Sequence, residues 1–194
     1  MTTGSVRGEL VIISGPSGVG KSTVCHRLCR AIPAEFSVSV TTRPPRPGEI
    51  EAQDYHYISH EEFSRLREAD GLIESAEVYG NWYGTPAAPV EAALAAGRVS
   101  ILEIDIHGCR QVREKIPEAR TFFLLPPTPE EQKRRITGRR TDRADAIRER
   151  LSKADGEIRF AMESDCYDEF IINDDLDETV QRIISAIGKE KQQC

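Results

Sequence analysis

The segment Gly15-Pro16-Ser17-Gly18-Val19-Gly20-Lys21-Ser22 combines glycines, a lysine and a hydroxyl at a spacing that suits a polyphosphate. Backbone N–H groups of such a turn, at the N-terminus of a helix, point inward and bind an anion. Lys21 adds a positive charge for the β- and γ-phosphates, and the Ser22 hydroxyl is a ligand for Mg²⁺. The pattern predicts a nucleoside triphosphate site. A glycine-rich turn that binds nothing is the alternative, and the pattern does not specify a reaction.

The chain around this turn contains the elements that such a site requires. The apolar residues 10–13 before it predict a buried strand, and residues 22–31 after it predict a helix. Further along, strands are expected over 99–105, 121–125 and 170–173, and helices over 89–96, 108–115, 129–135, 145–162 and 177–187. This alternation predicts an α/β fold of the P-loop NTPase type, with a mostly parallel sheet, helices on both faces and ligands at the carboxyl ends of the strands.

Residues 37–86 break this alternation, because they are richer in strands and turns. Strands are expected over 36–42, 55–58 and 72–78, a helix over 59–69 with a capping box at Ser59 and Glu62, and loops over 43–48 and 80–86. We therefore expect an inserted lobe.

Size and composition limit the classes of protein to consider. The 194 residues suffice for one well-buried core with a small inserted lobe. The net charge of −6 argues against general binding to nucleic acid or to a membrane surface. No stretch has the length of a membrane span and residues 1–9 lack a secretory signal, so a cytoplasmic protein is expected. Five cysteines without Cys-x-x-Cys spacing predict neither disulfides nor zinc.

The loop that carries Arg43 and Arg46 is a second candidate site. Its two guanidinium groups alternate with three prolines, which restrict the backbone and preorganise the donors for a phosphate dianion. Nearby hydroxyls in segments 37–42 and 54–57 strengthen this interpretation. A solvated turn whose arginines face water is the alternative.

Several segments resemble the motifs of guanylate kinases and follow one another in the family's order along the chain. Besides the phosphate loop they are 37–49, 54–59, Gly80-Asn81-Trp82-Tyr83-Gly84-Thr85, Leu102-Glu103-Ile104-Asp105, Gly138-Arg139-Arg140-Thr141-Asp142 and Asn173-Asp174-Asp175-Leu176-Asp177. The resemblance implies ATP-dependent phosphorylation of GMP to GDP by a single domain. It implies a core of residues 1–36, 87–131 and 151–194, a GMP-binding lobe of 37–86 and a mobile lid of 132–150.

The resemblance also implies roles for individual residues. It assigns Gly15 through Thr23 and Asn173 to ATP, and the GMP phosphate to Arg43, Arg46, Tyr55 and Tyr83. It places Ser39, Glu74, Thr85 and Asp105 against guanine. Guanine presents N1–H and N2–H₂ side by side, and a carboxylate such as Glu74 accepts from both, which discriminates against adenine by roughly 10⁴-fold or more. An ordinary exposed strand residue is the alternative for Glu74.

Two further groups are expected to act on the phosphates: an acidic residue that binds Mg²⁺ and a basic lid segment that stabilises negative charge. Glu103 ends an apolar strand, where a carboxylate commonly reaches Mg²⁺ through water, so Mg²⁺ bound with ATP is the expected cofactor. By resemblance, Arg135, Arg139 and Arg150 would stabilise the migrating phosphoryl group on lid closure, although a run of arginines is often only a solvated helix face. No general base is needed, because the acceptor phosphate is already anionic.

Two other functions stay open at this point. A guanylate-kinase-like scaffold domain would bind protein partners and lack nucleotide binding, and a kinase for another nucleoside monophosphate would differ only at the base. The phosphate loop and the lid arginines favour an enzyme with ATP and GMP as its partners, and no protein partner is implied. Three positions, Ser75, Trp82 and Arg140, depart from the usual family pattern.

Overall fold

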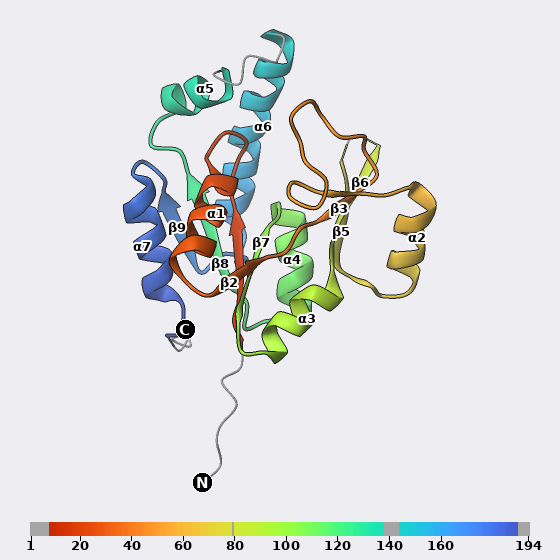
Figure 1. The fold of residues 1–194 in the computed structure, drawn as a ribbon. Coiled ribbons are helices and arrows are strands. Elements are labelled where there is room, and N and C mark those ends of the chain that lie inside the picture. The colour runs from red at the N-terminus through yellow and green to blue at the C-terminus, as the bar shows by residue number, and fades with distance from the viewer. Residues whose placement is uncertain (1–7, 79, 138–143, 190–194) are drawn as a thin grey trace.

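The described part of the chain folds around two sheets (Figure 1). The computed structural model describes residues 8–78, 80–137 and 144–189, with the backbone alone for 144–150 and 152. No helix within these residues combines the length and the apolar character that crossing a bilayer requires.

The larger sheet leads into the phosphate loop. Its strands lie in the order β2-β7-β1-β8-β9, and all neighbours are parallel. They are β1 Leu10–Ser14, β2 Ala34–Phe36, β7 Val99–Glu103, β8 Arg120–Leu125 and β9 Glu169–Ile172. All five residues of the central strand β1 are buried, as expected for a strand covered on both faces. The predicted mostly parallel α/β architecture is confirmed.

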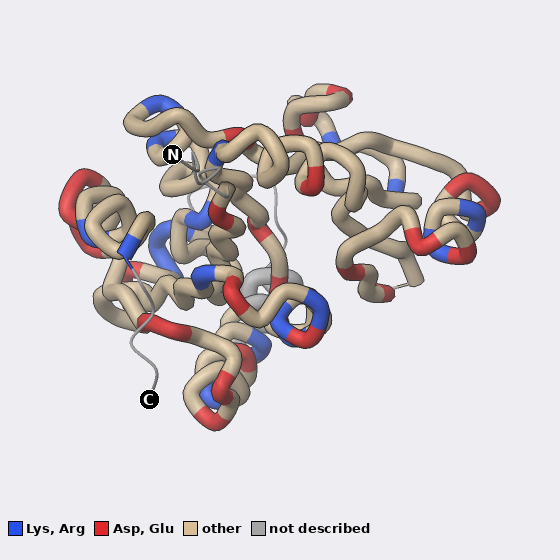
Figure 2. The backbone as a smooth tube through the Cα atoms, turned by 90° about the horizontal axis from the view of Figure 1, so that it is seen from below, with Lys and Arg blue, Asp and Glu red and all other residues tan. Residues whose placement is uncertain are grey.

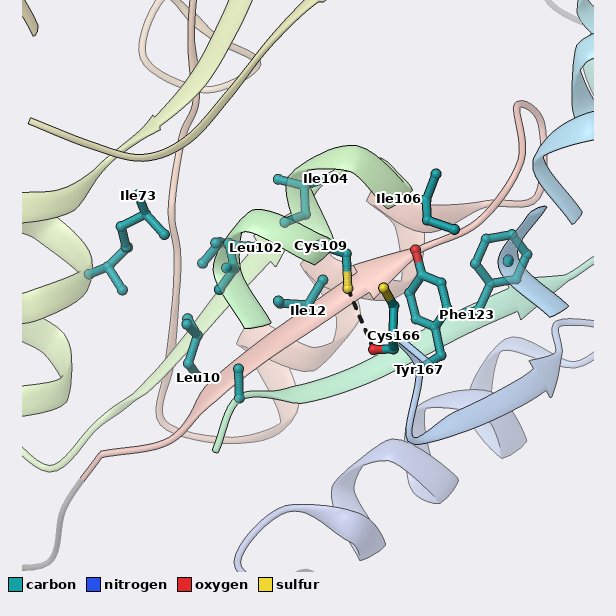
Figure 3. Packing of buried hydrophobic residues seen from close by; sticks show 14 residues of the cluster. Leu10, Ile12, Ile73, Leu102, Ile104, Ile106, Cys109, Phe123, Cys166 and Tyr167 are labelled. Carbon is teal, nitrogen blue, oxygen red and sulfur yellow. Dashed lines mark hydrogen bonds between the residues drawn. The ribbon is translucent and has the colours of Figure 1, made fainter. Parts of the chain in front are cut away.

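Helices cover the two faces of this sheet with separate apolar clusters. They are α1 Lys21–Ala31 and α7 Leu176–Ala186 on one face, and α3 Ala87–Ala95, α4 Ile106–Lys115 and α6 Ala144–Glu163 on the other. Side chains alternate along β1, so Val11 and Ile13 pack toward α1 and α7 while Leu10 and Ile12 pack toward the other helices. Figure 3 shows this second cluster, in which Cys109 Sγ lies 3.8 Å from the carbonyl oxygen of Cys166.

The smaller sheet has the order β4-β3-β6-β5 and carries α2 His60–Glu68. Its strands are β3 Val40–Thr41, β4 His56–Tyr57, β5 Leu72–Val78 and β6 Asn81–Pro86, of which β3 and β4 pair in parallel and the other pairs are antiparallel. The predicted capping box opens α2, since Ser59 Oγ accepts from the Glu62 N–H at 3.1 Å and Glu62 returns the bond. Phe63 packs against Trp82 with ring centroids 5.7 Å apart. In Figure 2 acidic and basic residues mix around α2, at the right.

Two predicted elements of this region were wrong. The single strand expected over 36–42 is divided between β2 in the larger sheet and β3 in the smaller one. The loop expected over 80–86 is largely strand β6. Glycine is typical of turns, but Gly84 is needed here for packing inside the sheet, because a Cβ there would lie 3.0 Å from the Glu74 carbonyl oxygen and 3.3 Å from Phe63 Cζ.

Helix boundaries differ from the predicted ones by at most two residues, and a cap explains the clearest case. Helix α4 begins at Ile106 because Asp105 is its N-cap, with Oδ1 accepting from the Gly108 N–H at 2.9 Å. Helix α5 Pro129–Thr137 begins after Thr128, whose Oγ1 accepts from the Glu131 N–H at 3.1 Å. The Asp105 carboxylate is thereby fixed at the carboxyl end of β7.

Candidate active site

Close contacts at its glycines hold the phosphate loop in shape. Gly15, Gly18 and Gly20 have φ angles of 148°, 79° and 100°, which residues with a Cβ rarely adopt. A Cβ at Gly15 would lie 2.6 Å from the carbonyl oxygen of Leu124, and one at Gly18 would lie 2.5 Å from Cγ1 of Ile136. The loop is therefore packed between β8 and α5 in a shape that requires glycine.

The first turn of α1 places a cation and a hydroxyl beside this loop. Lys21 Nζ donates to the carbonyl oxygens of Gly15, at 2.7 Å, and Pro16, at 3.3 Å. Ser22 Oγ donates to Glu103 Oε1 at 3.0 Å. Hydroxyl and carboxylate oxygens are the hard donors that Mg²⁺ prefers, so the chemistry of this pair fits that ion.

Asn173 and Arg135 lie against the opposite side of the loop. Asn173 Nδ2 donates to the Val19 carbonyl oxygen at 2.7 Å, and a Cβ at Gly20 would lie 2.8 Å from the same nitrogen. Arg135 Nη1 donates to the Asn173 carbonyl oxygen at 2.9 Å, while its Nε donates to Glu131 Oε1 at 2.8 Å. The arginine is thus held at the loop by its own helix and by the residue that follows β9.

Helix α5 also contacts the loop through Gln132, which sequence reasoning missed. Its side chain is buried, and Nε2 donates to the Ser17 carbonyl oxygen at 3.0 Å. The segment expected to form a lid therefore starts with residues already packed on the phosphate loop. Arg139 and Arg140 lie outside the described residues, as does the side chain of Arg150.

A cavity of about 450 Å³ separates the phosphate loop from the smaller sheet. The sequence-predicted site residues that line it are Gly15, Ser17, Lys21, Ser39, Tyr55, Glu74, Tyr83, Glu103 and Asp105. These residues come from segments up to 90 positions apart, and both sheets contribute to the walls. One space can therefore hold a ligand on the loop and a second ligand on the smaller sheet.

Glu74 is the buried carboxylate of this cavity, with 5% of its surface exposed. Thr85, its partner across the β5–β6 pair, donates from Oγ1 to Oε1 at 2.7 Å, and Ser39 Oγ lies 3.4 Å from the same threonine oxygen. Burial raises the pKa of Glu74 to about 7, and the charge of Asp105 adds to the rise, whereas the Thr85 hydrogen bond opposes it. The carboxylate is therefore poised for a ligand that donates hydrogen bonds.

Arg43 is held by a carboxylate that the sequence did not single out. Its Nη1 and Nη2 donate to the two oxygens of Glu49, both at 2.7 Å, and its guanidinium lies 5.0 Å from the centre of the Tyr55 ring. Tyr57 donates its hydroxyl to Glu49 at 2.8 Å. The arginine lowers the pKa of Glu49 to about 2, mainly through these hydrogen bonds. Arg46 is exposed beside this cluster, with its backbone N–H bound to Glu49 at 2.7 Å.

The described cavity lining does not include either arginine of the 43–48 loop. Tyr55 and Tyr83 connect the arginine loop to the cavity, because both line it and their ring centroids lie 5.8 Å apart. Burial raises the pKa of Tyr55 to about 12, so its hydroxyl keeps its proton and stays a donor near neutral pH.

Glu157 of α6 also lines the cavity, and sequence reasoning missed this carboxylate. Burial raises its pKa, the charge of Lys21 opposes that rise, and the backbone N–H of Ser17 binds it. No local motif marks Glu157, because its place at the loop follows only from the path of α6 along the sheet. Glu49 had a weak signal, namely an acidic residue six positions from Arg43 in a stiff loop.

Comparison with known proteins agrees with this geometry. The family model described as guanylate kinase matches residues 7–190. A guanylate kinase of Synechocystis sp. is 43% identical over 96% of this chain and 97% of its own, and one of Parasynechococcus marenigrum is 48% identical over 93% and 98%. A crystal structure of guanylate kinase from Anaplasma phagocytophilum superposes with a TM-score of 0.76 at 34% identity, covering 94% of this chain and 86% of that one. The chain belongs to the guanylate kinase family.

Proposed function

We propose that this chain transfers the γ-phosphoryl group of ATP to GMP, giving ADP and GDP in purine nucleotide metabolism. The observation that carries the proposal is one cavity lined both by Lys21 of the phosphate loop and by the buried carboxylate Glu74. The first group suits a polyphosphate and the second suits the donor edge of guanine. The names of the relatives support the same reaction.

The donor half of the site is proposed to run from Gly15 to Thr23. Its backbone N–H groups bind the ATP phosphates, and Lys21 balances the charge that develops on the leaving oxygen. Asn173 follows β9 and contacts the loop, which supports its assignment to the adenine side. Ser22 and Glu103 would hold Mg²⁺, which would supply positive charge to the β- and γ-phosphates.

The acceptor half is proposed to consist of a guanine wall and a phosphate clamp. The guanine wall is Ser39, Glu74, Thr85 and Asp105, and the phosphate clamp is Arg43, Arg46, Tyr55 and Tyr83. Glu74 accepts from N1–H and N2–H₂ of guanine, while Thr85 holds its other side. The GMP phosphate competes with Glu49 for the guanidinium of Arg43, and its own anionic oxygen attacks ATP without a general base.

We further propose the functional division into a core of 1–36, 87–131 and 151–194, a GMP-binding lobe of 37–86 and a lid of 132–150. The smaller sheet, whose strands all lie between residues 40 and 86, supports the lobe. The lid would bring Arg135, Arg139 and Arg150 to the transferred group and exclude water. A cytoplasmic location is proposed because ATP and GMP are its substrates.

A panel of acceptors tests the reaction. Purified protein with Mg·ATP is offered GMP, AMP, UMP and dTMP in turn, and ADP formation is followed. GMP should be the best acceptor, by roughly 10⁴-fold over AMP, because adenine presents a lone pair where guanine presents N1–H. A better turnover with AMP, UMP or dTMP would contradict the role of Glu74.

Calorimetric titration with a non-hydrolysable ATP analogue and Mg²⁺ separates the enzyme from a protein-binding scaffold. Heat of binding is expected for this chain and a strongly reduced heat for Lys21→Met, which matches lysine in length without its charge. Absence of heat with the unmodified chain would support the scaffold and overturn the proposed donor site.

A further inference from the structure

Strand β5, which carries Glu74, is an edge strand of the smaller sheet, and its free edge faces a helix of the core. The sheet order ends at β5, so among the described residues the backbone groups that do not pair with β6 have no further strand to bind. Helix α4 lies beside this edge (Figure 1). An unpaired strand edge that is shielded from water loses hydrogen bonds unless side chains supply them.

One face of α4 supplies those bonds. Gln111 acts like a neighbouring strand, since its Oε1 accepts from the Ser75 N–H at 3.0 Å and its Nε2 donates to the Ser75 carbonyl oxygen at 2.9 Å. One turn further along, Lys115 Nζ donates to the carbonyl oxygens of Ile73, at 2.7 Å, and Leu72, at 3.3 Å. Residues on both sides of Glu74 are therefore tied to the core helix.

The same face contacts Glu74 itself one turn earlier. A Cβ at Gly108 would lie 2.8 Å from Glu74 Oε2 and 3.2 Å from its Cδ, so the carboxylate rests directly on the glycine. Gly108, Gln111 and Lys115 are three and four positions apart, which places them on one face of the helix. We call these three residues the α4 face.

We propose that the α4 face sets the position of the Glu74 carboxylate and thereby the selectivity for the acceptor base. This inference rests on the proposed function, because it assigns a task to residues that touch Glu74 or its strand instead of the nucleotide. Gln111 and Lys115 are positioning residues that fix the strand. Gly108 determines how closely the carboxylate can approach the core.

Electrostatics favour the same arrangement. The charge of Lys115 lowers the pKa of Glu74, whereas the charge of Asp105 and burial raise it. The lysine that binds the strand therefore also favours the ionised carboxylate, the form that accepts from both N1–H and N2–H₂ of guanine.

Gly108→Ala is the sharpest test, because alanine is favoured in a helix and its methyl group meets the flexible end of Glu74. The assay measures KM for GMP, KM for ATP, kcat, and the ratio of kcat/KM for GMP over IMP, whose base lacks the N2 amino group. We expect KM for GMP to rise about tenfold and the GMP-over-IMP ratio to fall several-fold, because a displaced carboxylate no longer meets N2–H₂. KM for ATP should stay unchanged.

Two further variants report on the strand contacts. Gln111→Glu keeps the size and the acceptor but turns an oxygen toward the Ser75 carbonyl, and Lys115→Met removes the donor to residues 72 and 73. Both variants should raise KM for GMP. Lys115→Arg keeps the positive charge, so its KM for GMP should lie between that of the unmodified chain and that of Lys115→Met. Arg110→Ala, an exposed position on the same helix, is the matched control and should behave as the unmodified chain.

The outcomes separate this inference from the proposed function. If the unmodified chain does not phosphorylate GMP, the proposed function fails and this inference fails with it. If the unmodified chain does so, and folded Gly108→Ala keeps its KM for GMP and its GMP-over-IMP ratio, the inference alone is wrong. Equal losses of kcat with GMP and IMP, with a higher KM for ATP, would show a merely structural role. Should Gln111→Glu not fold, the Gly108 and Lys115 variants decide.

Discussion

The phosphate loop and the guanine wall face one cavity but are built from different parts of the chain. The loop is one continuous segment that would bind with backbone groups, and it is held by glycines whose neighbours leave no room for a side chain. The guanine wall consists of side chains from β5, β6, the cap of α4 and the segment before β3. It includes a buried carboxylate whose pKa is raised to about 7. Anion binding therefore rests on the loop geometry and the charge of Lys21, whereas base selectivity requires burying a carboxylate, which lowers stability.

The largest expected effect tests the donor side of this comparison. Lys21→Met removes the one charged side chain of the phosphate loop, so kcat should fall by about 10³-fold or more. The shape of the loop depends on its glycines, so the midpoint of thermal unfolding should change little. Calorimetry should still detect binding of GMP. Loss of GMP binding in this variant would show that the two halves of the cavity are not separate.

The next effect tests the acceptor side. Glu74→Gln keeps one carbonyl oxygen, which can still accept from Thr85 Oγ1. Its NH₂ group replaces the second carboxylate oxygen and repels the N–H donors of guanine. We expect kcat/KM for GMP to fall by about 10²-fold or more, with KM for ATP unchanged. A similar loss with respect to ATP would contradict the division into two halves.

The pH dependence of Glu74 sharpens the same contrast. Its pKa is about 7 in the folded chain against an ordinary 4.5, so between these values the folded state holds more protons than the unfolded state. The free energy of unfolding should therefore decrease as pH rises through this window, and Glu74→Gln should remove that decrease. KM for GMP should rise as pH falls below about 7, because the protonated carboxyl loses an acceptor. Thermal unfolding and initial rates across this range check both signs.

Glu49→Gln tests how far the acceptor side depends on ion pairs. Arg43 and Glu49 side chains are 8% and 18% exposed, so removing the carboxylate leaves a nearly buried cation and should lower the free energy of unfolding by about 1–3 kcal/mol. The pKa of Glu49 is lowered to about 2, so this contribution is present above its ordinary value of 4.5 and is lost as pH falls toward 2. Urea unfolding at several pH values measures it. An unchanged KM for ATP is the control.

The smallest expected effect comes from Tyr57→Phe, which deletes one hydrogen bond to Glu49. The free energy of unfolding should fall by about 0.5–1.5 kcal/mol, and the pair between Arg43 and Glu49 should persist. A loss as large as that of Glu49→Gln would mean that the tyrosine, and not the arginine, holds the carboxylate.

The contrast between a contiguous loop and a wall assembled from distant segments explains what the sequence could predict. The phosphate loop is contiguous, so its spacing and the apolar strand before it were sufficient, and the alternation of later elements predicted the parallel sheet. Strand β6 was mistaken for a loop because Gly84 looks like a turn residue until its packing on Phe63 is known. The division between β2 and β3 was missed because it depends on a long-range contact: Ser37, near the start of the expected strand, is buried and its Oγ lies 3.0 Å from Ser100 Oγ.

The guanine wall depends on contacts that no local pattern contains. The burial of Glu74 follows from its pairing with Thr85 and from Gly108 beneath it, 11 and 34 positions away. Glu49 and Gln132 belong to no sequence motif, and their roles follow from their hydrogen bonds to Arg43 and to the Ser17 carbonyl oxygen. For these residues the family resemblance supplied the expected roles of their neighbours, and the structure supplied the contacts.

The crowding around the loop glycines has an evolutionary consequence. Gly15, Gly18 and Gly20 each abut a different element, so even one methyl group at any of them meets β8, α5 or the residue after β9. Substitution at these three positions is therefore opposed by close contacts, whereas the opposite wall owes its selectivity to a few side chains that can be exchanged. After gene duplication, one copy could change its specificity for the acceptor nucleotide by exchanging a few side chains. The triphosphate-binding loop would be inherited unchanged.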